Sequence, residues 1–133
     1  GVKGNGELLE FGLSVAMEEP ETFDSFVKKI REKTNIPLQY SKGREEVNRV
    51  FVIAGSGKGM TEEILAAGCD CVTTGESSYH DMLDLKERGI SCICLGHDES
   101  EKISVDTLAK LINDKFDSVK AASYIEESLV KYI

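Results

Sequence analysis

Three short apolar runs, each followed directly by a glycine, constrain the fold of this 133-residue chain more than any other feature. They are RVFVIA at 49–54, with a glycine-rich loop after it, CDCVTT at 69–74 and ISCICL at 90–95. Uninterrupted apolar strands that alternate with amphipathic helices are typical of parallel pairing with both sheet faces covered. The sequence therefore predicts an α/β fold: a layered βαβαβα arrangement, with a largely parallel sheet flanked by helices.

The helices between and after these runs are predicted from capping residues and apolar spacing. Thr61 is expected to cap the first helix, and Ser77 or Ser78 the second. Ser104 is placed as the cap of the last helix, whose apolar stripe consists of Val105, Leu108, Ala109 and Ile112.

The flanking regions complete one predicted domain over residues 1–133. A helical stripe made of Phe23, Phe26, Val27 and Ile30 is entered through Pro20 and stops before Pro37. Strands are predicted at 8–17, at 36–41 and, at a sheet edge, at 119–127. No repeat, low-complexity tract or linker divides the chain.

The charge balance excludes several classes of partner. The chain has 24 acidic residues against 16 Lys and Arg, a formal net charge of −8. Because clustered Lys and Arg supply most of the affinity for duplex nucleic acid, neither duplex DNA or RNA nor an anionic membrane is expected to bind. No apolar run approaches the ~20 residues that span a bilayer and no signal-peptide pattern opens the sequence, so a cytoplasmic protein is expected.

Two C-x-C pairs contain all four cysteines: Cys69 with Cys71, and Cys92 with Cys94. Both pairs lie in apolar runs, where strand alternation would put the two members of a pair on one face. We expect four reduced, buried thiols that act as small core residues, and we prefer this interpretation to a zinc site.

Both histidines of the chain follow predicted strands, at the sheet edge where ligands bind in open parallel sheets. His97 and Glu101 are four residues apart, so a helical turn would place them on one side as two ligands of a metal site. Glu76 and His80 have the same spacing and would suit acid–base work or a bound water. In each case the alternative is a polar helix start that carries no site.

The loop GSGKG at 55–59 resembles a phosphate cradle only in part. A Walker A loop is rejected, because Val52 stands where its first glycine should be and Gly59 where its hydroxyl residue should be. The backbone N–H groups and Lys58 remain candidates for holding an anion, and a simple tight turn is the alternative.

Taken in order, RVFVIAGSGKG, AAGCDCVTTGESSYHD and RGISCICLGHDESE resemble the C-terminal half of the GTP cyclohydrolase I type 2 homolog family, also called NIF-three-like or dinuclear-metal-centre proteins. GVKGNGEL resembles the family's G-x-G-x-x-G-E-L motif, with Lys3 where the second glycine is expected. The resemblance implies an α/β fold of two similar halves and assembly as toroidal hexamers built from dimers.

The resemblance also implies roles for individual residues. Two metal ions would be held by a His pair and an Asp from the family's N-terminal half, together with His97 and Glu101. Glu76 and His80 would border the metals as candidate catalytic residues in contact with substrate or water. This sequence has no adjacent His pair, so the chain is expected to carry half of the metal site and to bind metal weakly by itself.

The function implied is that of a metal-dependent, cyclohydrolase-like hydrolase acting on a nucleotide-like small molecule, with two zinc, iron or manganese ions in each complete site. The alternative is a non-enzymatic protein-interaction or regulatory scaffold with a structural or vestigial metal site. A third interpretation is a non-catalytic protein whose glycine turn and Lys58 hold an anionic regulator. A homo-oligomer is expected, because one half of a two-half fold exposes the apolar face that packs against the other.

Overall fold

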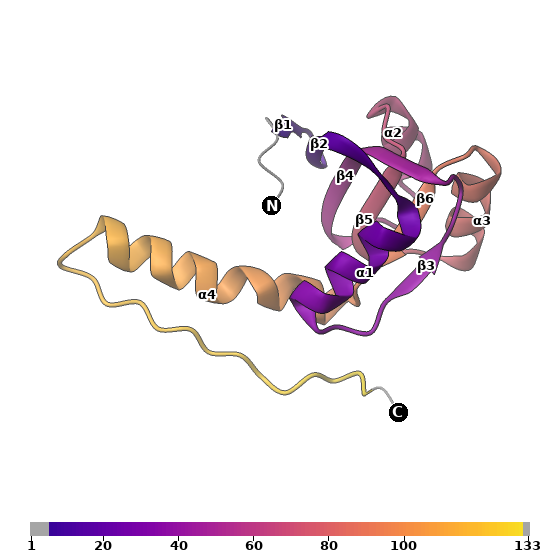
Figure 1. Cartoon of the computed structure of the whole chain (residues 1–133). Helices are drawn as coiled ribbons and strands as arrows, with labels where there is room; N and C mark the ends of the chain where they lie inside the picture. Colours follow the sequence, from indigo (N-terminus) through magenta and orange to yellow (C-terminus); the bar gives the residue numbers. More distant parts are fainter. Residues whose placement is uncertain (1–5, 132–133) are drawn as a thin grey trace.

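A computed structural model describes residues 6–131, whose elements form one six-stranded sheet with the strand order β1-β2-β4-β5-β6-β3 (Figure 1). The first five residues of the motif GVKGNGEL lie outside the described residues. No helix in this part of the chain is long and apolar enough to cross a membrane.

The centre of the sheet is parallel, as the sequence predicts. It consists of β4 (Glu46–Ser56), β5 (Cys71–Glu76) and β6 (Ser91–Cys94), which pair in that order. Two short helices make the crossovers, α2 (Thr61–Ala66) and α3 (Tyr79–Glu87). The predicted α/β class with a largely parallel sheet is therefore confirmed, although the outer strands pair antiparallel.

Alternation along these strands produces two apolar layers, one on each face of the sheet. Phe51 and Val72 point to the side covered by α2 and α3, where they pack with Ile64 and Leu85. The opposite layer packs against the helix α1 (Phe23–Thr34); its buried residues are Phe23, Phe26, Val47, Val50, Cys71 and Ile93. Because both faces are covered, the central strands need no polar side, which explains the apolar runs.

The capping predictions are partly right. Ser78 caps α3, and its hydroxyl accepts a hydrogen bond from the backbone N–H of Asp81. Thr61 was expected to cap α2, but it is the first residue of that helix and Met60 precedes it without a side-chain cap. The helix α1 begins after Thr22, which caps it, and ends before Pro37 as predicted.

The N-terminal strand predicted at 8–17 is a hairpin instead. The strands β1 (Gly6–Leu9) and β2 (Gly12–Thr22) pair antiparallel around a turn at Glu10 and Phe11. A Cβ on Gly12 would lie 2.4 Å from the carbonyl oxygen of Val52, so glycine is needed where β2 passes this close to β4. The strand predicted at 36–41 is shortened to β3 (Gln39–Ser41) at the opposite edge.

The four cysteines are free and buried, as expected. Cys92 and Cys94 share one face of β6, with their sulfur atoms 3.9 Å apart. The other pair does not share a face: Cys69 precedes β5 and packs in the layer under α2, whereas Cys71 faces α1. The prediction failed there because alternation applies only inside a strand, and β5 begins at Cys71.

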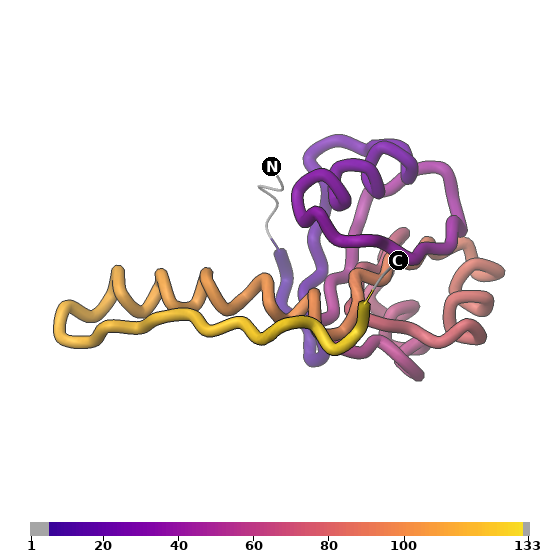
Figure 2. Tube along the Cα trace, turned by 90° about the horizontal axis from the view of Figure 1, so that it is seen from below, coloured from indigo at the N-terminus to yellow at the C-terminus, as the bar shows by residue number. Residues whose placement is uncertain are grey.

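The last helix, α4 (His97–Lys115), begins seven residues before the predicted cap. Ser104 lies inside the helix, where its hydroxyl donates to the carbonyl oxygen of Glu101. The helix extends away from the sheet, and the chain then returns beside it in an extended conformation (Figures 1 and 2). The edge strand predicted at 119–127 is therefore wrong, because this segment lies along α4 and belongs to no strand.

Candidate functional site

The carboxyl ends of the parallel strands meet at one edge of the sheet and bring three predicted site residues together. Glu76 ends β5, and His97 begins α4 after two intervening residues that follow β6. Glu101 follows one helical turn later on the same side of α4. The site therefore joins two neighbouring strand ends, as expected for a parallel sheet.

The imidazole of His97 lies between two carboxylates. Its Nδ1 is 3.2 Å from Oε1 of Glu76, and its Nε2 is 3.2 Å from Oε1 of Glu101. Hydrogen bonding to the Glu76 carboxylate, aided by the negative charge of Glu101, raises the pKa of His97 above its usual value. In this arrangement Glu76 fixes the orientation of the ring, and Nε2 points to the same place as the Glu101 carboxylate.

Two glycines allow this close approach. Gly55 has a φ of +67°, and a Cβ there would lie 3.0 Å from Oε1 of Glu101. A Cβ on Gly75 would lie 2.4 Å from the carbonyl oxygen of Gly55 and 3.0 Å from the Cα of His97. The glycines after the predicted strands thus mark the positions where the first turn of α4 passes over the sheet edge.

His97, Glu76 and Glu101 line one cavity of about 480 Å³. Its other walls come from the start of β3 and Pro37 before it, from the first turn of α4 and from residues 128–130, with Pro37, Gln39, Asp98, Glu99, Ser128, Leu129 and Val130 among them. The described lining contains four carboxylates and no Lys or Arg. Such a surface attracts a cation and repels an unneutralised phosphate.

His80 is not part of this cavity. It is exposed on the first turn of α3, and its ring lies 5.6 Å from that of Tyr79 in an edge-to-face arrangement. Its expected partner Glu76 turns toward His97 instead, because β5 lies beside β6 in the sheet. The four-residue spacing of Glu76 and His80 thus brings no pair together, whereas that of His97 and Glu101 does.

Three backbone N–H groups of the glycine loop 55–59 already have hydrogen-bond partners within the chain. The N–H of Gly57 donates to the carbonyl oxygen of Glu76, and that of Lys58 to the hydroxyl of Ser56. The N–H of Gly59 donates to the carboxylate of Asp81 at 3.1 Å. Asp81 also accepts from the hydroxyl of Ser78 at 2.6 Å, and this bond lowers the pKa of Asp81. Asp81, which sequence reasoning missed, takes the place expected for a bound anion.

One further buried charge has a structural explanation. The carboxylate of Asp70 lies at the opposite, amino end of β5, where it pairs with Arg44 at 2.6 Å. It also accepts the backbone N–H groups of Asn48 and Arg49. Asp70 therefore holds the start of β4 against the start of β5, and we assign it a structural rather than a catalytic role.

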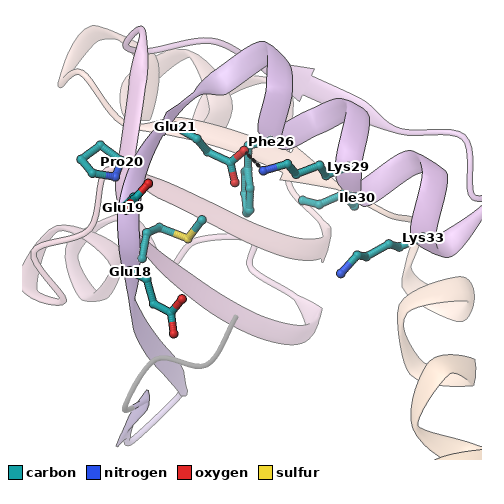
Figure 3. Close-up of a pocket in the computed structure, with 9 residues that line it drawn as sticks. Glu18, Glu19, Pro20, Glu21, Phe26, Lys29, Ile30 and Lys33 are labelled. Atoms are coloured by element: carbon teal, nitrogen blue, oxygen red, sulfur yellow. Dashed lines mark hydrogen bonds and ion pairs between the residues drawn. The ribbon is translucent and has the colours of Figure 1, made fainter. Parts of the chain in front are cut away.

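A second cavity of similar volume lies between β2 and α1 (Figure 3). Met17, Phe26 and Ile30 supply its apolar surface, and an ion pair between Lys29 and Glu21 crosses it. It contains no histidine or cysteine and does not reach the strand ends.

The residues at the strand ends suit a divalent cation but do not complete a site. An imidazole nitrogen and a carboxylate oxygen are common ligands of zinc, iron and manganese. Histidine ligands commonly donate their second N–H to a carboxylate, which is the relation of His97 to Glu76. Within residues 6–131, no group of three or more His, Cys, Asp or Glu side chains is arranged to hold a metal ion.

Comparison with known proteins classifies the chain. The family profile Duf34/NIF3 (NGG1p interacting factor 3) matches residues 7–128. This chain belongs to the Duf34/NIF3 family. The resemblance read from the three strand ends is thereby confirmed.

Curated relatives of this Duf34/NIF3 chain are named GTP cyclohydrolase 1 type 2 homolog. One from Staphylococcus aureus is 29% identical over 125 residues, which cover 92% of this chain and 34% of the relative. The one from Pyrococcus abyssi is 30% identical over 112 residues, which cover 81% of this chain and 44% of the relative. The chain therefore spans between a third and a half of the length of these relatives.

Solved structures show the same fold. The crystal structure of Staphylococcus aureus protein SA1388 matches with a TM-score of 0.79 and 28% identity, over 92% of this chain and 42% of that one. The Bacillus cereus protein related to NIF3 matches with a TM-score of 0.79 and 22% identity, over 92% of this chain and 35% of that one. The second likeness supports the fold alone.

Proposed function

We propose that this Duf34/NIF3 chain contributes His97 and Glu101 to a divalent metal centre of a hydrolase that acts on a nucleotide-like small molecule. The single observation that supports this most is the convergence of Nε2 of His97 and Oε1 of Glu101, 3.2 Å apart, in a cavity with an acidic lining. We take the remaining ligands of the two ions to come from outside the described residues, since within these no group of three or more His, Cys, Asp or Glu side chains is arranged to hold a metal ion.

The side chains of this chain have separate tasks in the proposal. His97 and Glu101 would bind the metal ion. The Nδ1–H of His97 donates to the carboxylate of Glu76, and this leaves Nε2 as the ligand atom. Gly55 and Gly75 hold the first turn of α4 against the strand ends. When bound, zinc, iron or manganese would lower the pKa of a bound water and polarise the bond to be hydrolysed. His80 lies outside the cavity and has no task in this arrangement.

Metal titration tests the proposal directly. Calorimetric titration with Zn²⁺ or Mn²⁺ of this chain and of a full-length relative should show weak binding by the chain and tight binding by the full-length protein. His97→Ala in this chain, and replacement of the aligned residue in the relative, should abolish the binding. His80→Ala is the matched control, since it removes the other histidine from an exposed position. Metal binding that survives His97→Ala, or that needs His80, would contradict the proposal.

An interaction scaffold is the second candidate. It is favoured by the exposed apolar residues on α4 and on the segment that returns beside it, such as Leu108, Leu111 and Tyr124. The two functions differ in their dependence on metal: hydrolysis by the full-length protein must vanish when a chelator removes the ions, whereas binding of a protein partner need not.

A further inference from the structure

The segment that follows α4 returns to the candidate site. Residues 119–131, here called the strap, run in an extended conformation along α4 toward the sheet (Figures 1 and 2). At the far end, the side chain of Asn113 exchanges two hydrogen bonds with the backbone of Ala121, both of 2.8 Å. These bonds replace a strand partner and hold the strap in register with the helix.

A second anchor lies beside the metal-binding residues proposed above. The hydroxyl of Ser128 donates to the carboxylate of Glu99 and accepts from the ammonium of Lys102 at 2.7 Å. Lys102 also pairs with Asp98 at 2.7 Å and is only 18% exposed. Ser128 thereby ties the strap to the first two turns of α4, which also carry His97 and Glu101.

The strap closes one side of the cavity. Ser128, Leu129 and Val130 line it together with His97 and Glu101. Without these three residues the cavity would be open on the side of the strap.

We propose that the strap is a movable wall of the His97–Glu101 cavity and that Ser128 is the positioning residue that seats it. Release of Ser128 from Glu99 and Lys102 lets residues 128–130 swing away and opens the cavity to solvent and to ligands. That the cavity is a metal site rests on the proposed function above. The position and movement of the strap do not, and the following tests use the chain without metal.

A disulfide tests the seat. In Glu99→Cys/Ser128→Cys the two thiols replace groups in direct contact, so mild oxidation should close a bridge between them. Glu99→Cys/Ser123→Cys is the matched control, because Ser123 lies five residues away, about 16 Å along an extended chain. The native cysteines are buried and should stay reduced. Failure of the first pair to bridge, or equal bridging by both pairs, would overturn the proposal.

Two accessibility measurements test the movement. Ser128→Ala removes hydrogen bonds to charged groups, so tryptic cleavage after Lys131, which directly follows the released residues 128–130, should become about tenfold faster. Modification of His97 by diethylpyrocarbonate should rise by up to about twofold, since 47% of its side chain is already exposed. The exposed His80 is the internal reference.

Ser128→Thr, which keeps the hydroxyl, should restore both rates, and Ser123→Ala should change neither. Faster cleavage with unchanged modification of His97 would show a seated strap that is no wall, and would overturn the proposal. Mn²⁺ titration of the unmodified chain and of His97→Ala separates the two claims. Binding that does not depend on His97 would end the proposed function, whereas the strap is judged by the bridge and the two rates.

Discussion

Gly75 is the residue on which the geometry of the site depends most. A methyl group there would lie 2.4 Å from the carbonyl oxygen of Gly55, 2.6 Å from the hydroxyl oxygen of Ser100 and 3.0 Å from the Cα of His97. The Ser100 side chain can turn away, but the two backbone contacts cannot be relieved by a rotamer change. We expect Gly75→Ala to cost about 1–3 kcal/mol of stability by overpacking and to separate His97 from Glu76. Urea denaturation measures the first effect, and the imidazole ¹H–¹⁵N spectrum measures the second.

Gly59→Ala is the control for Gly75→Ala. No atom lies within 4 Å of a Cβ at Gly59, and its φ of +75° alone should cost about 1 kcal/mol. The signals of His97 should stay unchanged in this variant. Equal effects of the two substitutions would show that the contact between the strand end and α4 does not explain why position 75 needs glycine.

The pH dependence of stability should report Asp81. Its pKa is lowered below the ordinary value of 3.8, chiefly by the hydroxyl of Ser78. The native state therefore gains stability above the unfolded pKa and loses it as pH falls through the folded pKa. We expect Asp81→Asn to cost about 1 kcal/mol at neutral pH, and this difference from the unmodified chain to shrink below about pH 4. Urea denaturation of both proteins from about pH 3 to about pH 7 measures this stability difference. A difference that grows on acidification would refute the stabilising role of the Asp81 carboxylate.

At the level of elements, two serines that are alike in sequence should respond differently to substitution. Ser78 caps α3 and also donates to Asp81, so Ser78→Ala should lower stability by about 1 kcal/mol. Ser104 lies inside α4 and is exposed, so Ser104→Ala should change stability by less than about 0.5 kcal/mol. Thermal unfolding of both variants makes the comparison. A larger loss for Ser104→Ala would favour the helix start that the sequence predicts.

The elements that were predictable from the sequence are those whose signals are local. The apolar runs at 49–54, 69–74 and 90–95 end at glycines, and they become the parallel centre of the sheet. The start of α4 was missed because its first turns are polar, and its apolar stripe begins later. The strap was assigned to the sheet because an extended segment does not carry the identity of its partner, which here is a helix.

The site was predictable to the same extent. The four-residue spacing of His97 and Glu101 is a property of one helix, and the structure preserves it. The pairing of Glu76 with His97 depends on β5 lying next to β6, so sequence spacing pointed to His80 instead. The role of Asp81 at the glycine loop also depends on two segments that are far apart in the chain.

The distribution of apolar surface over the whole molecule bears on its assembly. Helix α4 has no buried residue. Nine large apolar side chains of α4 and the following segment are 45–93% exposed: Ile103, Leu108, Leu111, Phe116, Val119, Tyr124, Ile125, Leu129 and Val130. Exposed apolar side chains in this number, on one helix and the segment beside it, favour association.

We therefore expect the chain to form a dimer or a larger oligomer, opposed by its net charge of −8. Since salt screens that repulsion, raising the ionic strength from about 0.01 to 0.15 M should increase the mass measured by light scattering. Leu108→Ser/Leu111→Ser should shift the chain toward monomer, because both side chains are 58% exposed on α4. Leu8→Ser is the control, since Leu8 is 82% exposed on β1 at the sheet edge. A chain that is monomeric at every salt concentration would show that the apolar side chains of α4 and the strap stay in contact with solvent. It would also remove the main observation in favour of the scaffold function.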